Sequence, residues 1–232
     1  MTPGQMQATS MKDFAPSRAR LPRAPSARSL AKRERIVEAA MRHFAESGYQ
    51  AARVEDIAIE LGIAKGSIFQ HFGSKQGLFL AAYKKAVDLL PAYLDCPPEV
   101  RTKGFFAIVE YWLGETPHLI RDDWIPYRVT LLGNYAIDLG LKREINRYLR
   151  THDPYGTVAF VRYGIERGEV RTDMDFEMTI SMVDWLMEKF QDALVTRELD
   201  PGLFVRSGQQ TSPAHARIDQ FVKLLRRAIG RR

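Results

Sequence analysis

The stretch from residue 54 to residue 72 constrains the fold of this chain more than any other. Its first half repeats apolar residues at i, i+3, i+4 and i+7, which predicts one short amphipathic helix: Val54, Ile57, Ala58 and Leu61. Gly62 should end this helix, because glycine adopts the left-handed conformation at little cost. A second short helix should follow directly. Two short helices around one glycine predict a helix-turn-helix, whose second helix enters the major groove of DNA.

The second of these helices should have one buried and one exposed side. Its buried positions are predicted to be Ile68, Phe69 and Phe72, and its outward positions Lys65, Ser67, Gln70 and His71. Upstream, apolar residues between Ile36 and Phe44 repeat at helical spacing, and Gly48-Tyr49 should close that helix. Downstream, the hydroxyl of Ser74 can cap a further helix.

Three helices that bracket a helix-turn-helix and lead into a fourth resemble the DNA-binding domain of the TetR family of transcriptional regulators. The residues that carry the resemblance are Ile36, Ala39, Ala40, Phe44, Gly48-Tyr49, Val54 to Ala58, Gly62-Ile63, Lys65 to Phe69, His71-Phe72, Ser74-Lys75 and Leu78-Phe79. The resemblance covers about a quarter of the chain and implies double-stranded operator DNA as a partner. The DNA-binding residues it implies are Arg53, Lys65, Gly66, Ser67, Phe69, Gln70, His71 and Lys75.

These residues divide by the chemistry of their side chains. Gln70 can pair with adenine through its amide, and Ser67 is a less selective reader. Lys65, Lys75 and Arg53 are expected to contact phosphates, and His71 is expected to rest against one.

Three positions depart from the family pattern. Ala52-Arg53 replaces two hydroxyl residues, Ala64 replaces a hydroxyl cap, and Phe69 replaces a tyrosine. Each change affects a backbone contact and leaves the fold intact.

Charge and composition fit this interpretation. The chain has 232 residues and a net charge of +6, and residues 1–95 hold 14 Lys and Arg against 9 Asp and Glu. This excess can neutralise phosphates, although it is also a common property of protein surfaces.

One cysteine, Cys96, excludes an internal disulfide. Without an apolar run of about 18 residues or a signal sequence, we expect a soluble, cytoplasmic protein with no membrane partner.

The chain should divide into three parts. Residues 1–28 are predicted to be a disordered basic tail, either an arm along DNA or a solvated leader. Residues 29–95 should form the DNA-binding domain with its connecting helix. Residues 96–232 should form a helical regulatory and dimerisation domain, which makes the fold all-α.

Several expectations concern this last part. Thr116-Pro117 should start a short helix, with Pro at its first position. The helices over Phe176 to Leu199 and Ala214 to Ile229 carry more apolar surface than one domain needs. By resemblance they should pair in a homodimer, with ordinary packing within one chain as the alternative. Residues 200–213 should form a loop.

No pattern typical of an enzyme is present. The five histidines lack metal-ligand spacing, and no phosphate loop or nucleophile motif occurs. We therefore expect no catalytic site, no metal and no cofactor. Amphipathic residues spread over several helices predict a small-molecule pocket instead: Trp112, Tyr127, Arg128, Asn134 and Trp185.

Together these patterns predict a repressor of the TetR type. By resemblance, its dimer binds a palindromic operator and is released by a small-molecule inducer. The alternative is a ligand-independent, DNA-bound scaffold that recruits another protein, and it differs in lacking an enclosed cavity.

Overall fold

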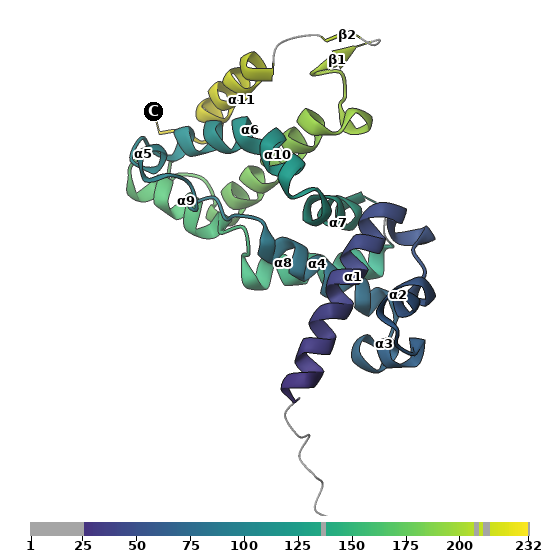
Figure 1. The fold of residues 1–232 in the computed structure, drawn as a ribbon. Helices are drawn as coiled ribbons and strands as arrows, with labels where there is room; N and C mark the ends of the chain where they lie inside the picture. The colour runs from purple at the N-terminus through teal and green to yellow at the C-terminus, as the bar shows by residue number, and fades with distance from the viewer. Residues whose placement is uncertain (1–25, 136–137, 207–208, 211–213, 232) are drawn as a thin grey trace, which may run out of the picture.

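The computed structural model describes residues 26–135, 138–206, 209–210 and 214–231, and these are almost entirely helical, as predicted. The first four helices are α1 (Ala27–Ala51), α2 (Val54–Leu61), α3 (Lys65–Phe72) and α4 (Lys75–Leu89). The rest are α5 (Pro98–Arg101), α6 (Phe105–Asp122), α7 (Trp124–Tyr135), α8 (Leu139–His152), α9 (Thr157–Glu166), α10 (Phe176–Val195) and α11 (Ala214–Ile229). Figure 1 shows α1 to α3 at one end of the molecule and α9 to α11 at the other.

Helices α1 to α4 share one hydrophobic core with α7 and α8. Its centre is aromatic, because the Phe44 and Phe79 rings meet edge to face with centroids 5.0 Å apart. Helix α4 packs against both α1 and α7. The helices that carry the helix-turn-helix are therefore anchored to helices from much later in the chain.

The ends of the first helices follow the predicted rules. Gly62 closes α2 in the left-handed conformation, with φ of 62°. Gly48 breaks the helical conformation near the end of α1, with φ of 77°. The Ser74 hydroxyl accepts a hydrogen bond from the Gly77 amide at 3.0 Å and caps α4. Arg53 and Ala64 precede α2 and α3 without a side-chain cap, as their side chains predict.

A second core joins α6, α9, α10 and α11. The rings of Phe105 and Phe160 stack in it with centroids 4.1 Å apart. An antiparallel bridge between Val170 and Gly230 ties the end of α11 to the segment after α9. This core forms the body that carries α10 and its exposed face.

Two local predictions were wrong. Pro117 lies inside α6, so no helix starts at Thr116. The Thr116 hydroxyl donates to the Trp112 carbonyl at 2.6 Å and so does not cap a new helix. The predicted loop over residues 200–213 contains two short antiparallel strands, β1 (Val205–Arg206) and β2 (Gln209–Gln210). The Asp200 carboxylate organises the turn before β1 by accepting four successive backbone amides, from residue 202 to residue 205.

The predicted apolar stripe of α11 lies largely in the core of its own protomer, and its role in pairing stays a prediction. Val222 is buried within its own chain, and the Phe221 ring packs on Phe190 with centroids 4.3 Å apart. Most of the apolar stripe of α11 faces α6, so a charge at Val222 would disturb the protomer itself. Leu224 is the large apolar side chain that α11 leaves exposed.

Most of the predicted N-terminal tail, residues 1–25, lies outside the described residues. Its last residues belong to the first helix, because α1 begins at Ala27 and the Ser26 hydroxyl accepts a hydrogen bond from the Ser29 amide at 3.2 Å. The boundary at residue 95 stays a prediction. Within the described parts of the chain, no helix combines the length and the apolar character needed to cross a membrane.

Gly133 of α7 allows a close approach to α4, which gives a test of this packing. A Cβ atom at Gly133 would lie 2.4 Å from Cε2 of the buried Tyr83 ring. We expect Gly133→Ala to destabilise the protein by about 1–3 kcal/mol, because neither buried helix has room to yield. Thermal unfolding should register a loss of roughly 2–4 °C per kcal/mol.

Gly114→Ala is the matched control. Gly114 lies exposed in α6 with open space around its added Cβ, so alanine should leave the melting temperature unchanged or raise it. A Gly133→Ala protein that melts at or above the temperature of the parent would contradict the packing of α4 on α7.

Candidate functional site

Helix α3 presents one polar side to solvent. Ile68 is fully buried beneath it and fixes the helix against its neighbours. Lys65, Gly66 and Gln70 are exposed, whereas Ser67 is half-buried. The other predicted members, Phe69 and His71, are half-buried as well, so Phe69 is less deeply placed than the apolar pattern predicts. The polar groups nevertheless form one outward surface.

Lys65 is held by its neighbours at the start of α3. Its ammonium pairs with the carboxylate of Glu55 and lies 5.5 Å from the centroid of the Phe69 ring. The hydrogen bond from Lys65 lowers the pKa of the Glu55 carboxyl. A phosphate that approaches Lys65 must therefore compete with Glu55 for the ammonium.

Lys75 and Arg53 flank the same surface. The Lys75 ammonium donates to the Gln50 carbonyl at 3.0 Å and lies 5.0 Å from the centroid of the Tyr49 ring. Burial lowers the pKa of Lys75. The Arg53 side chain is exposed at the start of α2.

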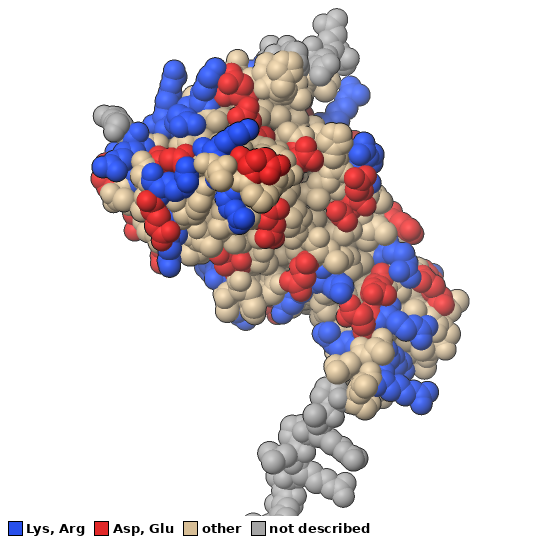
Figure 2. Space-filling model, turned by 60° about the vertical axis from the view of Figure 1, so that its left-hand side comes forward, with Lys and Arg blue, Asp and Glu red and all other residues tan. Residues whose placement is uncertain are grey.

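The beginning of α1 adds basic residues that the sequence interpretation did not assign to the site. The guanidinium of Arg33 lies 5.0 Å from the centroid of the Phe72 ring, which places the basic N-terminal half of α1 beside the end of α3. Exposed cations there also include Arg28 and Arg35. In Figure 2 the described surface next to the grey N-terminal trace is mainly tan and blue. In the sequence, the helical spacing of Arg28, Lys32 and Arg35 (i, i+4, i+7) could have predicted this basic face of α1.

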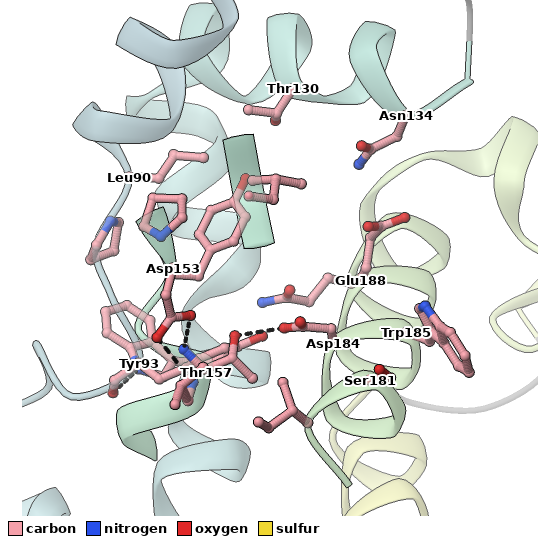
Figure 3. A pocket seen from close by; sticks show the side chains of 18 of the residues that line it. Leu90, Tyr93, Thr130, Asn134, Asp153, Thr157, Ser181, Asp184, Trp185 and Glu188 are labelled. Atoms are coloured by element: carbon pink, nitrogen blue, oxygen red, sulfur yellow. Dashed lines mark hydrogen bonds between the residues drawn. The ribbon is translucent and has the colours of Figure 1, made fainter. Parts of the chain in front are cut away.

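A cavity of about 780 Å³ lies between α4 and several of the helices that follow it. Its walls come from α4, α6, α7, α8, α9 and α10 and from the segments after α4 and α8. Figure 3 shows Thr130 and Asn134 of α7 facing Asp184 and Glu188 of α10 across it. Four of the five predicted ligand residues line this cavity: Trp112, Tyr127, Asn134 and Trp185.

Arg128 is not among the lining residues. Its guanidinium lies 5.7 Å from the centroid of the Trp124 ring, and its buried Nε has no hydrogen-bond partner among the described residues. Because Arg128 follows Tyr127 directly in α7, its side chain points to a different side of the helix, away from the cavity. Among the described contacts, Arg128 forms no ion pair with Asp122 or Asp123.

The predicted aromatic residues line the cavity in different ways. The Trp112 indole donates to the Tyr93 carbonyl at 2.8 Å, so it offers the cavity an apolar face. The Tyr127 hydroxyl donates to the buried Asp192 carboxylate at 3.2 Å. Trp185 is 61% exposed and marks the outer edge of the cavity.

Carboxylates that the sequence interpretation missed gather on one side of the cavity. The Thr157 hydroxyl donates to Asp184 at 2.6 Å, and the amide of Thr157 donates to Asp153 at 2.9 Å (Figure 3). Burial, together with the nearby Asp153 and Glu188 carboxylates, raises the pKa of Asp184 to about 6. Asp184 and Glu188 lie one turn apart on α10, whereas the fold brings Asp153 to them from the end of α8.

Helix α4 links the cavity to the helix-turn-helix. Its Tyr83 and the following Leu90 and Pro91 line the cavity. Two residues separate its first turn from the end of α3, and the two helices pack together. One continuous helix therefore joins this wall of the cavity to α3.

The described residues contain no group of three or more His, Cys, Asp and Glu that could hold a metal ion. Cys96 is buried, and burial raises the pKa of its thiol, which makes it a weak nucleophile.

Comparison with known proteins agrees with these features. The family profile described as "Bacterial regulatory proteins, tetR family" matches residues 36–82. The HTH-type transcriptional repressor AcnR of Corynebacterium efficiens is 28% identical over 171 residues, covering 74% of this chain and 86% of the relative. The fatty acid metabolism regulator protein of Bacillus subtilis is 25% identical over 154 residues, which are 64% of this chain and 75% of that protein.

A solved structure extends the likeness to the fold. The transcriptional regulator FadR from Bacillus subtilis, in complex with stearoyl-CoA, superposes with a TM-score of 0.59 at 20% identity. The match covers 83% of this chain and 96% of that structure. The helix-turn-helix, the all-helical fold and the related repressors agree, and they identify a DNA-binding regulator rather than an enzyme. Residues 36–82 of this chain therefore carry the DNA-binding domain of the TetR family of bacterial transcriptional regulators.

Proposed function

We propose that this protein is a homodimeric repressor that binds a palindromic operator through α3 and leaves it when a small molecule fills the cavity. The observation that carries the proposal is the position of α4, which contacts α3 at one end and lines the cavity at the other. A ligand that fits better when α4 is displaced would lower the affinity for DNA, as linkage between two sites requires.

Residues 29–95 serve as the DNA-binding domain in this proposal, and residues 96–232 as the regulatory and dimerisation domain. Gln70 and Ser67 read base edges from the polar side of α3. Lys65, Lys75 and Arg53 hold phosphates, and His71 rests against the backbone beside Gly66 and Phe69. The protein acts in the cytoplasm, where its DNA lies.

The outer side of α10 supplies the dimer surface. Met178, Met182, Trp185 and Leu186 recur at i, i+4, i+7 and i+8, and Trp185 is 61% and Leu186 40% exposed. Met182 is half-buried, and the other three form an exposed apolar face of the kind that marks interaction surfaces. In Figure 1, α10 and α11 lie at the end of the molecule opposite α3, so their pairing leaves both recognition helices free. Leu224 of α11, 63% exposed, extends this surface.

The alternative is a scaffold that binds DNA and recruits another protein without any ligand. A cavity of about 780 Å³ favours the ligand-responsive repressor, because it falls within the size range of small-molecule sites.

The proposed phosphate contact of Lys75 predicts a change in salt dependence. Lys75→Ala should weaken binding to all DNA sequences alike and flatten the slope of log affinity against log salt by about one unit. Fluorescence anisotropy over a salt series measures both. Lys103→Ala is the control, since Lys103 is exposed and lies before α6. If both variants keep the parental slope, Lys75 is not a phosphate contact.

The proposed role of Gln70 predicts a loss of sequence preference. Selection from random duplexes should recover an inverted repeat with half-sites about one helical turn, roughly 34–36 Å, or more apart. Gln70→Ala should lose about 1–3 kcal/mol on that operator and little on random DNA. An exposed glutamine away from α3, Gln220→Ala, provides the comparison. An unchanged preference in the Gln70→Ala protein would remove Gln70 from the base-reading residues.

The proposed dimer surface predicts a monomeric variant. Replacing Met178 and Leu186 together with Asp should separate the protomers, because the interface would bury charges without counter-ions. Light scattering at micromolar concentration should show a dimer for the parent and a monomer for this variant. Leu139→Asp tests whether an exposed apolar site elsewhere has the same effect. A monomeric parent, or a variant that remains dimeric, would contradict the assignment of α10.

A further inference from the structure

The charges around the cavity favour one class of ligand. Among the side chains that line the cavity, four carboxylates are half-buried or buried: Asp153, Asp184, Glu188 and Asp192. The cation that lines the cavity, Arg150, is exposed at the rim, and the exposed Glu177, which also lines it, carries the opposite charge. The inner wall of the cavity is therefore acidic.

Three of these carboxylates already have partners. Asp153 accepts the amides of Thr157 and Val158 at the start of α9, at 2.9 and 3.1 Å. Asp192 accepts hydrogen bonds from the hydroxyls of Tyr127 and Tyr135.

Glu188 has a cation for its partner. The Lys189 ammonium lies 2.6 Å from its carboxylate, and Lys142 is close enough to interact with it. Neither lysine lines the cavity.

Asp184 is different. Within the described chain its carboxylate accepts one hydrogen bond, from the Thr157 hydroxyl, and it has no ion pair. In Figure 3 it projects from α10 toward the centre of the cavity, whereas Trp185 lies on the other side of that helix. A half-buried carboxylate with one neutral hydrogen-bond partner and no counter-ion is stabilised when a cation approaches.

The rest of the cavity suits an apolar or aromatic body. Tyr93, Trp112 and Phe176 contribute aromatic side chains, and Leu119 and Ile180 contribute aliphatic ones. Aromatic faces attract organic cations as well as apolar groups.

We infer that the cavity binds an organic cation, an amine or quaternary ammonium group on an apolar body, with its charge placed at Asp184. This inference rests on the proposed role of the cavity as the inducer site. An anionic ligand such as the stearoyl-CoA bound by the Bacillus subtilis FadR would bring phosphates toward an acidic wall, which like-charge repulsion opposes.

Three probes with one apolar chain and different head groups test the charge: decyltrimethylammonium, decan-1-ol and decanoate. Binding to the full-length chain is measured by calorimetry at pH 8, below the micelle concentration of each probe. The cation should bind at least about tenfold more tightly than the alcohol, since a charged partner strengthens the contact with Asp184, and decanoate should bind most weakly.

Two variants assign the effect to one residue. Asp184→Asn should weaken binding of the cation by about ten- to a hundredfold and leave binding of the alcohol unchanged. Glu110→Gln, at an exposed position of α6 outside the cavity, should change neither. Asp184→Asn should also melt no lower than the parent at pH 8, because burial disfavours the charge that it removes.

A pH series supplies an independent readout. Since the pKa of Asp184 is raised to about 6, lowering the pH from 8 to 5 should protonate it and weaken binding of the cation. The Asp184→Asn protein should show a smaller change with pH, because Asp153, Glu188 and the other carboxylates that face the cavity remain in it.

Two kinds of result would contradict the inference, and they have different consequences for the proposed cavity. Equal affinities for the three probes, a preference for decanoate, or an unchanged cation affinity in Asp184→Asn would overturn the cation assignment and leave the proposed ligand cavity standing. If none of the three probes binds, both the cation assignment and the proposed cavity function fail.

Discussion

The contact between α4 and α7 is the physical constraint on which the rest of the molecule depends. Gly133 lets the backbone of α7 lie against the Tyr83 ring of α4, at a distance that any side chain would prevent. Tyr83 belongs to the core of the DNA-binding end and also lines the cavity. One buried side chain therefore participates in both parts of the molecule. In our proposal, a ligand that disturbs this packing reaches α3 without a separate relay.

The two ends of the protein differ in charge in a way that fits two different partners. The N-terminal half of α1 and the start of α3 expose Arg28, Arg33, Arg35 and Lys65, as contact with polyanionic DNA requires. The inner wall of the cavity carries carboxylates instead. DNA and the proposed cationic inducer therefore bind different charged side chains and do not compete for one site. In our proposal, their antagonism comes from the position of α4.

The helix-turn-helix could be predicted from the sequence because its signals are local. The apolar spacing from Val54 to Leu61, Gly62 in the left-handed conformation and the Ser74 cap each depend on a few neighbouring residues. The all-α fold follows from the same kind of pattern. Pro117 was misplaced because proline is tolerated within a long helix when packing holds it, and the surrounding residues do not show this.

The cavity could be predicted only in part. Trp112, Tyr127 and Asn134 were found because large amphipathic side chains favour such sites, whereas Arg128 turns away by one helical position. Asp184 precedes Glu188 and Asp192 by one and two turns on α10, but this spacing alone does not show that the three face a cavity. The significance of Asp184 comes from Asp153 at the end of α8 and Thr157 at the start of α9, which the fold brings to it. Likewise, the sequence of α11 does not show which of its apolar residues enter the second core and which stay exposed, because this depends on the packing of α6 against it.

The central claim is that α4 connects DNA binding to the cavity, and hydrogen exchange tests it most directly. Exchange would be followed by mass spectrometry in the full-length chain, with and without an operator duplex obtained by selection. Coupling through α4 predicts that operator slows exchange in α3, along α4 as far as Leu90, and in α7 around Gly133. Protection confined to α1, α2 and α3, with α4 and α7 unchanged, would contradict it.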